Sequence, residues 1–135
     1  MVLLQLTAKP LRGGGINPKN YPYADELKAL IKEEIIEIDK PIPLQESKDL
    51  INKARKIICI DSYLQHLCWN LGKQAVVLWG QSDPLIFGHS ENINLLKHRN
   101  YLRNKQFDLW EFTEYNQTRN RPDAFVLPEE IIKYI

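Results

Sequence analysis

The chain has 135 residues, a length that suits one domain with one hydrophobic core and does not fit a complete two-domain enzyme. Its composition, 44% hydrophobic and 26% charged, is typical of a globular protein. Lysine and arginine total 18 against 17 aspartates and glutamates, so the formal charge of +1 creates no overall field that favours DNA, RNA or an anionic membrane. We therefore expect no nucleic-acid partner.

The cysteines and the first residues bear on the compartment. Cys59 lies in an apolar run and Cys68 on an apolar helix face, without the spacing of metal ligands or of a disulfide framework. The apolar stretch after Met1 is broken by Lys9 and Pro10, which makes it too short for a signal sequence or a membrane span. We expect a cytoplasmic protein with no membrane span and no metal cofactor.

The first half of the chain alternates apolar runs with helical patterns. Residues 2–6 predict a strand, and residues 7–22 a loop rich in Gly, Pro and Asn. In residues 23–34 apolar side chains recur at helical spacing. Residues 35–38 predict a second strand and residues 45–54 a second helix, so the order is βαβα.

The second half continues this alternation. Residues 56–60 predict a strand, residues 62–71 a helix closed by Gly72, and residues 74–79 a strand that is apolar on both faces. Residues 80–90 are interpreted as a loop, residues 92–96 as a short strand and residues 128–135 as a terminal helix. Strands buried on both faces indicate a parallel sheet covered by helices.

We therefore predict the α/β class, with one Rossmann-like domain over residues 1–135 and a mostly parallel sheet covered by helices. Residues 98–135 are rich in aromatic side chains and are expected to pack on this domain as a C-terminal extension.

Three loops are candidates for a binding site, because ligands of open α/β sheets bind outside the carboxyl ends of the parallel strands. The loops are residues 7–19, the junction at Asp61 and Ser62, and residues 80–88. The Asp61 carboxylate suits sugar hydroxyls, and the Ser62 hydroxyl with the N–H groups behind it suits a phosphate. Asp and Ser are equally favoured as helix N-caps, so spacing alone leaves capping and ligand contact both open.

The other two loops are less specific. Residues 80–84, Gly-Gln-Ser-Asp-Pro, could bring backbone amides close to a ligand, but turn chemistry explains them equally well. The glycines at 13–15 match no phosphate-binding fingerprint. Lys9, Arg12 and Lys19 suit a diphosphate, although an exposed basic loop is usually only solvated. A lone histidine such as His66 is more often a packed or surface residue than a ligand.

Three segments carry a resemblance: Ile-Asp-Ser-Tyr-Leu-Gln-His-Leu at 60–67, Leu-Gly-Lys at 71–73 and Val-Val-Leu-Trp-Gly-Gln-Ser-Asp-Pro at 76–84. In order, spacing and most residue types they resemble the carboxyl-terminal half of glycosyltransferase family 9, the heptosyltransferases, which have the GT-B fold. The family pattern is an apolar strand, Asp-Ser/Thr-Gly-x-x-His-Leu-Ala, Leu-Gly-Lys/Thr-Pro, a second apolar strand and aromatic-Gly-x-Thr/Ser-x-Pro. Residues 18–22 resemble the family's Lys-Arg-Trp-Pro element more weakly.

The resemblance implies a domain like one half of a GT-B glycosyltransferase, with a nucleotide-sugar as ligand. Carried over by position, Lys19 contacts the donor phosphates, Asp61 the donor sugar, and Ser62 the diphosphate, while His66 matches the motif histidine. It assigns no catalytic residue and no metal. The implied donor-binding set is Lys19, Asp61, Ser62, Tyr63, His66, Gly80, Ser82 and Asp83.

The sequence departs from the family pattern at two places. Tyr63 stands where the common form has Gly, and residues 35–50 are shorter than in the family, which leaves base contacts unassigned. The amino-terminal half, which in the family binds the acceptor and supplies the proposed general base, has no counterpart here. Transfer would then need a separate acceptor-domain chain or a homo-oligomer, docked on an apolar face; Tyr101, Trp110 and Phe112 are candidates for that face or for core packing.

Three hypotheses follow. The chain is a donor-binding glycosyltransferase domain whose activity depends on a partner, a non-catalytic module that sequesters a nucleotide or nucleotide-sugar, or a structural protein that keeps the fold without a ligand.

Overall fold

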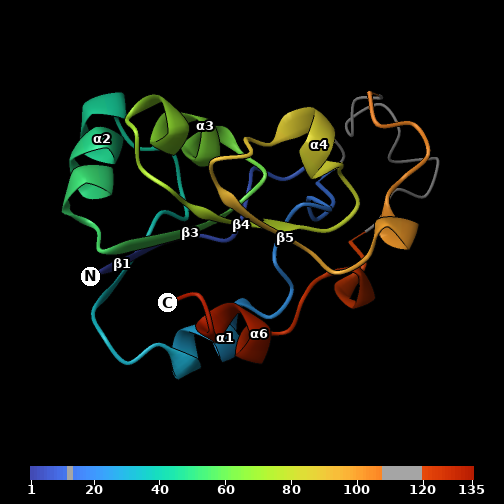
Figure 1. Cartoon of the computed structure of the whole chain (residues 1–135), viewed down its shortest axis with the longest axis horizontal. Coiled ribbons are helices and arrows are strands. Elements are labelled where there is room, and N and C mark those ends of the chain that lie inside the picture. The colour runs from blue at the N-terminus through green and yellow to red at the C-terminus, as the bar shows by residue number, and fades with distance from the viewer. Residues whose placement is uncertain (12–13, 108–119) are drawn as a thin grey trace.

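The computed structural model describes residues 1–11, 14–107 and 120–135. Five strands form a parallel sheet, and helices cover both of its faces (Figure 1). The strands are β1 (Val2–Gln5), β2 (Ile35–Glu37), β3 (Lys56–Ile60), β4 (Val76–Trp79) and β5 (Ile93–Leu96). The helices are α1 (Ala24–Leu30), α2 (Leu44–Lys53), α3 (Tyr63–Asn70), α4 (Pro84–Phe87) and α6 (Pro128–Ile132), with 3-10 turns η1 (Arg99–Tyr101) and η3 (Pro122–Ala124).

All neighbouring strands are parallel, in the order β2-β1-β3-β4-β5. The chain leaves β1 toward β2 on one side and returns to β3 on the other, so the order reverses between β1 and β3. In doubly wound sheets such a reversal opens a crevice at the carboxyl ends of the two strands. Gln5 at the end of β1 is aligned with Cys59, near the end of β3. The predicted α/β class with a parallel sheet is confirmed.

The hydrophobic core has one layer on each face of the sheet. Alternate strand residues such as Leu4 and Ile58 pack with α1 and α6, whereas their neighbours such as Leu3 and Cys59 pack with α2 and α3. Strand side chains point alternately to opposite faces, so strands covered on both faces, such as β3 and β4, are apolar at nearly every position. Figure 1 shows the same division, with α2, α3 and α4 above the sheet and α1 and α6 below it.

Three predicted elements differ most from the observed ones. The first helix ends at Leu30 instead of residue 34, because Ile31 is already extended. Residues 80–90, predicted as a loop, contain the helix α4, which Pro84 starts and the Asp83 side chain caps. The terminal helix is confined to Pro128–Ile132. The elements of four or five residues are too short for a periodic pattern to define their ends.

Residues 98–135 contact the sheet domain through several side chains. Phe125 is buried in the core layer of α1 and α6, and the Tyr21 hydroxyl donates a hydrogen bond to the Val126 carbonyl at 2.8 Å. Tyr101 also packs against this layer, whereas Trp110 and Phe112 lie outside the described residues. In the described part of the chain, no helix is both long and apolar enough to cross a membrane.

Candidate functional site

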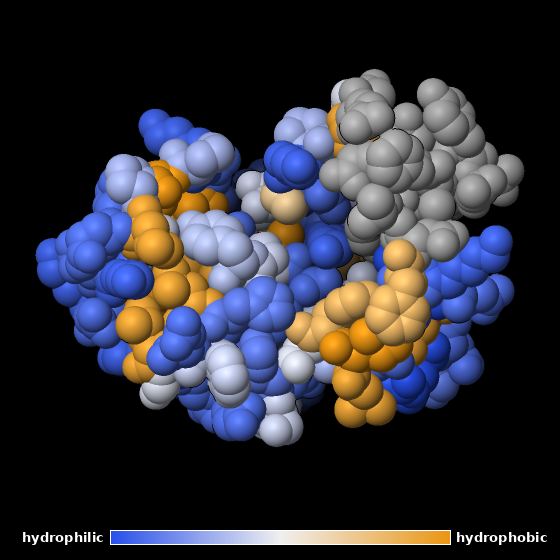
Figure 2. All heavy atoms as spheres, turned by 90° about the horizontal axis from the view of Figure 1, so that it is seen from above, coloured by the Kyte–Doolittle hydropathy of each residue, from blue (hydrophilic) through white to orange (hydrophobic). Residues whose placement is uncertain are grey.

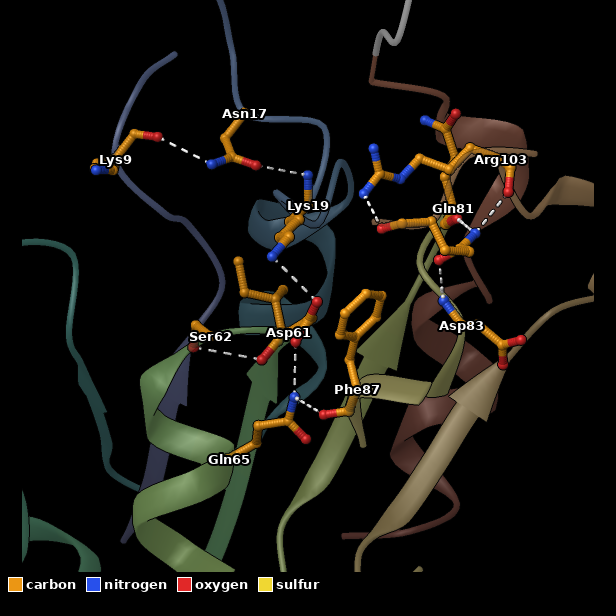
Figure 3. A network of polar contacts seen from close by, with 12 residues as sticks. Lys9, Asn17, Lys19, Asp61, Ser62, Gln65, Gln81, Asp83, Phe87 and Arg103 are labelled. Carbon is orange, nitrogen blue, oxygen red and sulfur yellow. Dashed lines mark hydrogen bonds and ion pairs between the residues drawn. The ribbon is translucent and has the colours of Figure 1, made fainter. Parts of the chain in front are cut away.

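The centre of the candidate site is the junction between β3 and α3. Asp61 is buried, with 8% of its surface exposed, and its carboxylate has two partners (Figure 3). Lys19 Nζ lies 3.1 Å from Asp61 Oδ2, and Gln65 Nε2 donates to Asp61 Oδ1 at 2.8 Å. The structure therefore brings together Lys19 and Asp61, which are 42 positions apart in the sequence.

The loop after β1 holds Lys19 in this position through asparagine side chains. Asn17 Oδ1 accepts the Lys19 backbone N–H at 3.0 Å, and Asn17 Nδ2 donates to the Lys9 carbonyl at 3.1 Å (Figure 3). Asn20 Oδ1 accepts the Ala8 N–H at 2.7 Å. Asn side chains often replace backbone partners in tight turns, and here they fold the loop back toward β3.

Ser62 joins the carboxyl ends of β1 and β3. Its hydroxyl donates to Gln5 Oε1, so it reaches across the crevice where the strand order reverses. Ser62 is the N-cap residue of α3 by position, but its side chain makes no capping hydrogen bond, and the Asp61 carboxylate binds side chains instead. Neither side chain caps α3, so helix capping does not account for these two residues.

Two cavities flank this junction. A small one of about 10 Å³ is lined by Lys19, Asp61 and residues 78–82, so all three predicted loops reach it. A larger one of about 550 Å³ lies beyond Ser62, at the carboxyl ends of β1 and β2. The larger cavity is lined mainly by apolar surface with a few polar groups: Gln5, Thr7, Ala8, Lys9, Pro10, Ile38, Asp39, Lys40, Pro41, Ser62 and Tyr63.

Tyr63 stands at the edge of the larger cavity. Its side chain is 44% exposed, and its hydroxyl lies 3.1 Å from Ser47 Oγ on α2. This hydrogen bond holds the first turn of α3 to α2 and turns the ring toward the cavity that it lines. Tyr63, which replaces the glycine of the family pattern, therefore lines the larger cavity.

The predicted residues after β4 have structural partners. A Cβ atom at Gly80 would lie 2.6 Å from Phe125 Cζ, so Gly80 leaves room for that ring. Ser82 is buried and lines the small cavity. Asp83 accepts the Leu85 N–H at 2.9 Å and binds Arg99 through both oxygens, at 3.1 and 2.7 Å. The hydrogen bonds from Arg99 lower the pKa of Asp83.

His66 lies on the outer side of α3 beside the loop that follows α4. Its Nδ1 is 2.7 Å from His89 Nε2, and the Trp69 ring stacks on His89 with ring centres 4.5 Å apart. Burial lowers the pKa of His66, and the nearby His89 lowers it further. Within the described residues, no group of three His, Cys, Asp or Glu side chains could hold a metal ion.

Several residues of the site were not predicted. Gln65 lies in the first turn of α3, four positions after Asp61, and this spacing could have indicated their contact. Gln106 holds the loop after β4, since Nε2 donates to the Gln81 carbonyl at 2.9 Å and Oε1 accepts the Asp83 N–H at 2.8 Å. Arg99 and Gln106 belong to a segment without periodic pattern, so no local signal pointed to them.

The loops after β1, β3 and β4 carry segments of the sequence resemblance, and residues from all three line the small cavity. A sequence model described as glycosyltransferase family 9 (heptosyltransferase) matches residues 15–111. The chain belongs to glycosyltransferase family 9. The match covers Lys19, the β3–α3 junction and the loop after β4. Searches of curated proteins and of solved structures gave no match.

Membership in glycosyltransferase family 9 agrees with the five-stranded parallel sheet. It makes a glycosyltransferase-like function the appropriate starting point for interpreting the cavities.

Proposed function

We propose that this chain binds a nucleotide-sugar donor at the carboxyl ends of β1, β3 and β4, and that sugar transfer depends on a partner chain or an oligomer. The observation that carries the proposal is the convergence of Lys19, Asp61 and Ser62 between two cavities of different size and polarity. The phosphates and the nucleoside have suitable counterparts there, and Asp61 offers a carboxylate to the sugar.

The diphosphate is assigned to the region between Lys19 and the start of α3. The N-terminus of α3 has no side-chain cap, and its N–H groups point along the helix axis toward the crevice. An anion at this place gains both these donors and the ammonium group of Lys19, whose side chain is 27% exposed. A bound diphosphate would compete with Asp61 for Lys19.

The donor sugar is assigned to the side of Asp61. Its carboxylate is buried and fixed by Gln65, so its remaining acceptor capacity is oriented before any ligand arrives. Sugar hydroxyls are the natural donors for such a group. The small cavity at Asp61, Gly80 and Ser82 has a volume of only about 10 Å³, so sugar binding requires it to widen.

The nucleoside is assigned to the larger cavity. Its volume of about 550 Å³ lies within the ordinary range of small-molecule sites, and its apolar walls include the Tyr63 ring. An aromatic ring at the cavity edge offers a stacking surface for a base. Asp39 and Lys40 at the end of β2 provide polar groups for a ribose or base edge.

Dependence on a partner is supported by exposed apolar side chains near the loop after β4. Leu85 and Phe107 are 82% and 78% exposed, and Ile86 is 42% exposed. Figure 2 views the face that carries α2, α3 and α4 and shows apolar atoms gathered in two areas, one of them on the right. Exposed apolar groups beside a ligand cleft are typical of a surface that a second domain covers.

A second candidate function is sequestration of the same ligand without transfer. The Asp61 carboxylate is engaged by Lys19 and Gln65, an arrangement that suits binding better than proton abstraction. Turnover measured with the purified chain, alone and with candidate partner chains, separates the two functions. No turnover in any combination, together with ligand binding, would favour sequestration.

Binding itself is tested by calorimetry against nucleotides and their sugar conjugates, with the variants Asp61→Ala and Lys19→Met. We expect Asp61→Ala to weaken binding of the sugar conjugate by about 10- to 100-fold, as for loss of a hydrogen bond to a charged group, and binding of the free nucleotide by less. Lys19→Met should weaken both ligands. Asp49→Ala on α2 serves as a matched control, because Asp49 pairs only with the exposed Gln45 amide in the described contacts. If no ligand binds, both candidate functions are wrong.

A further inference from the structure

Gln5 is a buried polar residue at the carboxyl end of an otherwise apolar strand. The residues of β1 are Val, Leu, Leu and Gln, and Gln5 is only 6% exposed. It follows Leu3 by two positions, so its side chain points to the face of the sheet that carries α2 and α3. An amide at this depth needs hydrogen-bond partners for its oxygen and for its nitrogen.

The oxygen of this amide has a partner, and the nitrogen has none in the described part of the chain. Gln5 Oε1 accepts the Ser62 hydroxyl. Nε2 carries two N–H donors and meets no acceptor among the described residues, although it is not sealed from solvent. A buried donor without an acceptor destabilises a protein. Because Gln5 lines the larger cavity, its N–H groups are available to a ligand there.

The surroundings of this donor favour an anionic ligand. Ser62 and Tyr63, where α3 begins, line the same cavity, and this eight-residue helix has no side-chain cap. Its first N–H groups are therefore open and carry the positive end of the helix dipole. Lys9 and Lys40 add positive charge to the cavity wall, and Asp39 adds one negative charge. A phosphate oxygen suits both the amide and the helix N–H groups.

The Ser62 hydroxyl is already engaged and cannot serve as the phosphate donor at the same time. A hydroxyl has a single O–H, and that of Ser62 is directed at Gln5 Oε1. The same contact holds Oε1 on the Ser62 side and so fixes where Nε2 points. Ser62 therefore orients the amide, and Gln5 carries the free donor.

We propose that Gln5 is a phosphate-binding residue, whose Nε2 donates to the phosphate that a bound nucleotide places at the start of α3. Ser62 is then a positioning residue that acts through Gln5. This inference rests on the proposed nucleotide site, and it moves the phosphate contact implied for Ser62 to a residue on β1. Gln5 becomes the group that distinguishes a nucleotide from its nucleoside.

The test is titration calorimetry of the purified chain with nucleosides, with their mono- and diphosphates and nucleotide-sugars, and with inorganic pyrophosphate. Gln5→Met keeps the length of the side chain without a donor. We expect it to weaken binding of the phosphorylated ligands by about 10- to 100-fold and binding of nucleosides by about twofold or less. Gln5→Glu is isosteric, keeps an acceptor for Ser62 and repels phosphate, so the loss should be larger.

The matched control is Gln45→Met, the same change at an exposed glutamine of α2 whose amide donates to Asp49. It should leave the binding of every ligand unchanged. Urea unfolding of the unliganded variants shows which of Gln5→Met and Gln5→Glu retains the native fold, and either one alone decides the comparison.

A double-mutant cycle tests the role given to Ser62. Ser62→Ala alone should weaken binding of the phosphorylated ligands by less than Gln5→Met does. Added to Gln5→Met, it should cause no further loss, because its contribution passes through the amide. A larger loss for Ser62→Ala than for Gln5→Met, or losses that add in the double variant, would assign the donor to Ser62 and overturn the inference.

The outcomes separate this inference from the proposed function. Nucleotide-sugar binding that neither Gln5 variant weakens overturns the inference and leaves the proposed function standing. An equal loss for nucleosides and nucleotides also overturns it, since Gln5 would then contact the nucleoside. Pyrophosphate binding that depends on Gln5, without binding of any nucleotide-sugar, supports the phosphate contact and contradicts the proposed function. A wild-type chain that binds none of these ligands overturns both.

Discussion

At the scale of single residues, the members of the predicted donor-binding set have different partners in the structure. The sequence pattern treated Asp61, Ser62, Gly80 and Asp83 alike, as members of one donor-binding set. In the structure, Asp61 and Ser62 border the cavities without capping α3, whereas Gly80 accommodates Phe125 and Asp83 binds Arg99. These partners come from the C-terminal segment, so no pattern around residues 80–84 could have revealed them.

Replacing Gly80 by Ala should destabilise the protein. The added Cβ would lie 2.6 Å from Phe125 Cζ, and a buried ring cannot yield without disturbing its neighbours. Overpacking of this kind costs about 1–3 kcal/mol, which urea unfolding would measure. Gly15→Ala is the matched control, because its Cβ would meet Leu11 Cδ1 at an ordinary 3.8 Å. Equal stability of both variants would show that Phe125 does not occupy this position.

The pair of Asp83 and Arg99 predicts a specific acid dependence. Hydrogen bonds from Arg99 hold the pKa of Asp83 below its ordinary value of about 3.9. The pair therefore contributes stability that is complete above that pH and is lost as the pH falls through the lower folded-state pKa. Asp83→Asn should unfold at lower urea than the wild type at pH 7, and the two should converge in acid.

The control for this pH dependence is Asp123→Asn. Asp123 also binds an arginine, Arg121 Nη2 at 3.0 Å, but both side chains are about half exposed. Exposed pairs contribute little, so this variant should follow the wild-type curve. An Asp83→Asn curve that runs parallel to the wild type into acid would contradict the prediction.

At the scale of elements, the sequence located all five strands and the longer helices and missed the short helix α4. β3 was predicted with its observed bounds, since five consecutive apolar or half-buried residues between polar ends leave little choice. The helix α4 was interpreted as loop, because four residues cannot display a helical period. This helix is stabilised by Asp83, whose side chain caps its first turn and pairs with Arg99.

The segment around Gln106 should be essential for the loop between β4 and α4. Gln106→Ala would leave the Gln81 carbonyl and the buried Asp83 N–H without their amide partner. We expect a loss of about 1–3 kcal/mol in unfolding free energy and weaker ligand binding, because the loop borders the Asp61 cavity. Asn104→Ala, at an exposed position nearby, should change neither, and a similar effect of both variants would argue against a specific clamp.

At the scale of the whole molecule, the sheet order decides where a ligand can bind. The reversal between β1 and β3 opens the crevice that Ser62 spans, and the loops after β1, β3 and β4 meet beside it. The same order leaves β2 and β5 at the two edges of the sheet.

The two thiols should report on global unfolding. Burial raises the pKa of Cys59 far above the ordinary value and raises the pKa of Cys68 to about 12, and both side chains are fully buried. Because the thiolate is the reactive form, we expect negligible reaction with a disulfide reagent in the native state and rapid reaction in urea. Stoichiometric labelling of either thiol without denaturant would show that α3 opens locally.

The sequence by itself determined the order of strands and helices, the parallel sheet and the family, because these depend on local periodicity and on motif spacing. It also indicated Lys19, Asp61 and Ser62. Only the tertiary structure decided that Lys19 forms an ion pair with Asp61 and that the Ser62 hydroxyl donates to Gln5 instead of capping α3. It also decided that the missing side chain at Gly80 leaves room for the Phe125 ring. Each of these contacts joins segments far apart in the chain, and the side chain of a polar residue takes whichever partner the packing of the sheet places nearest.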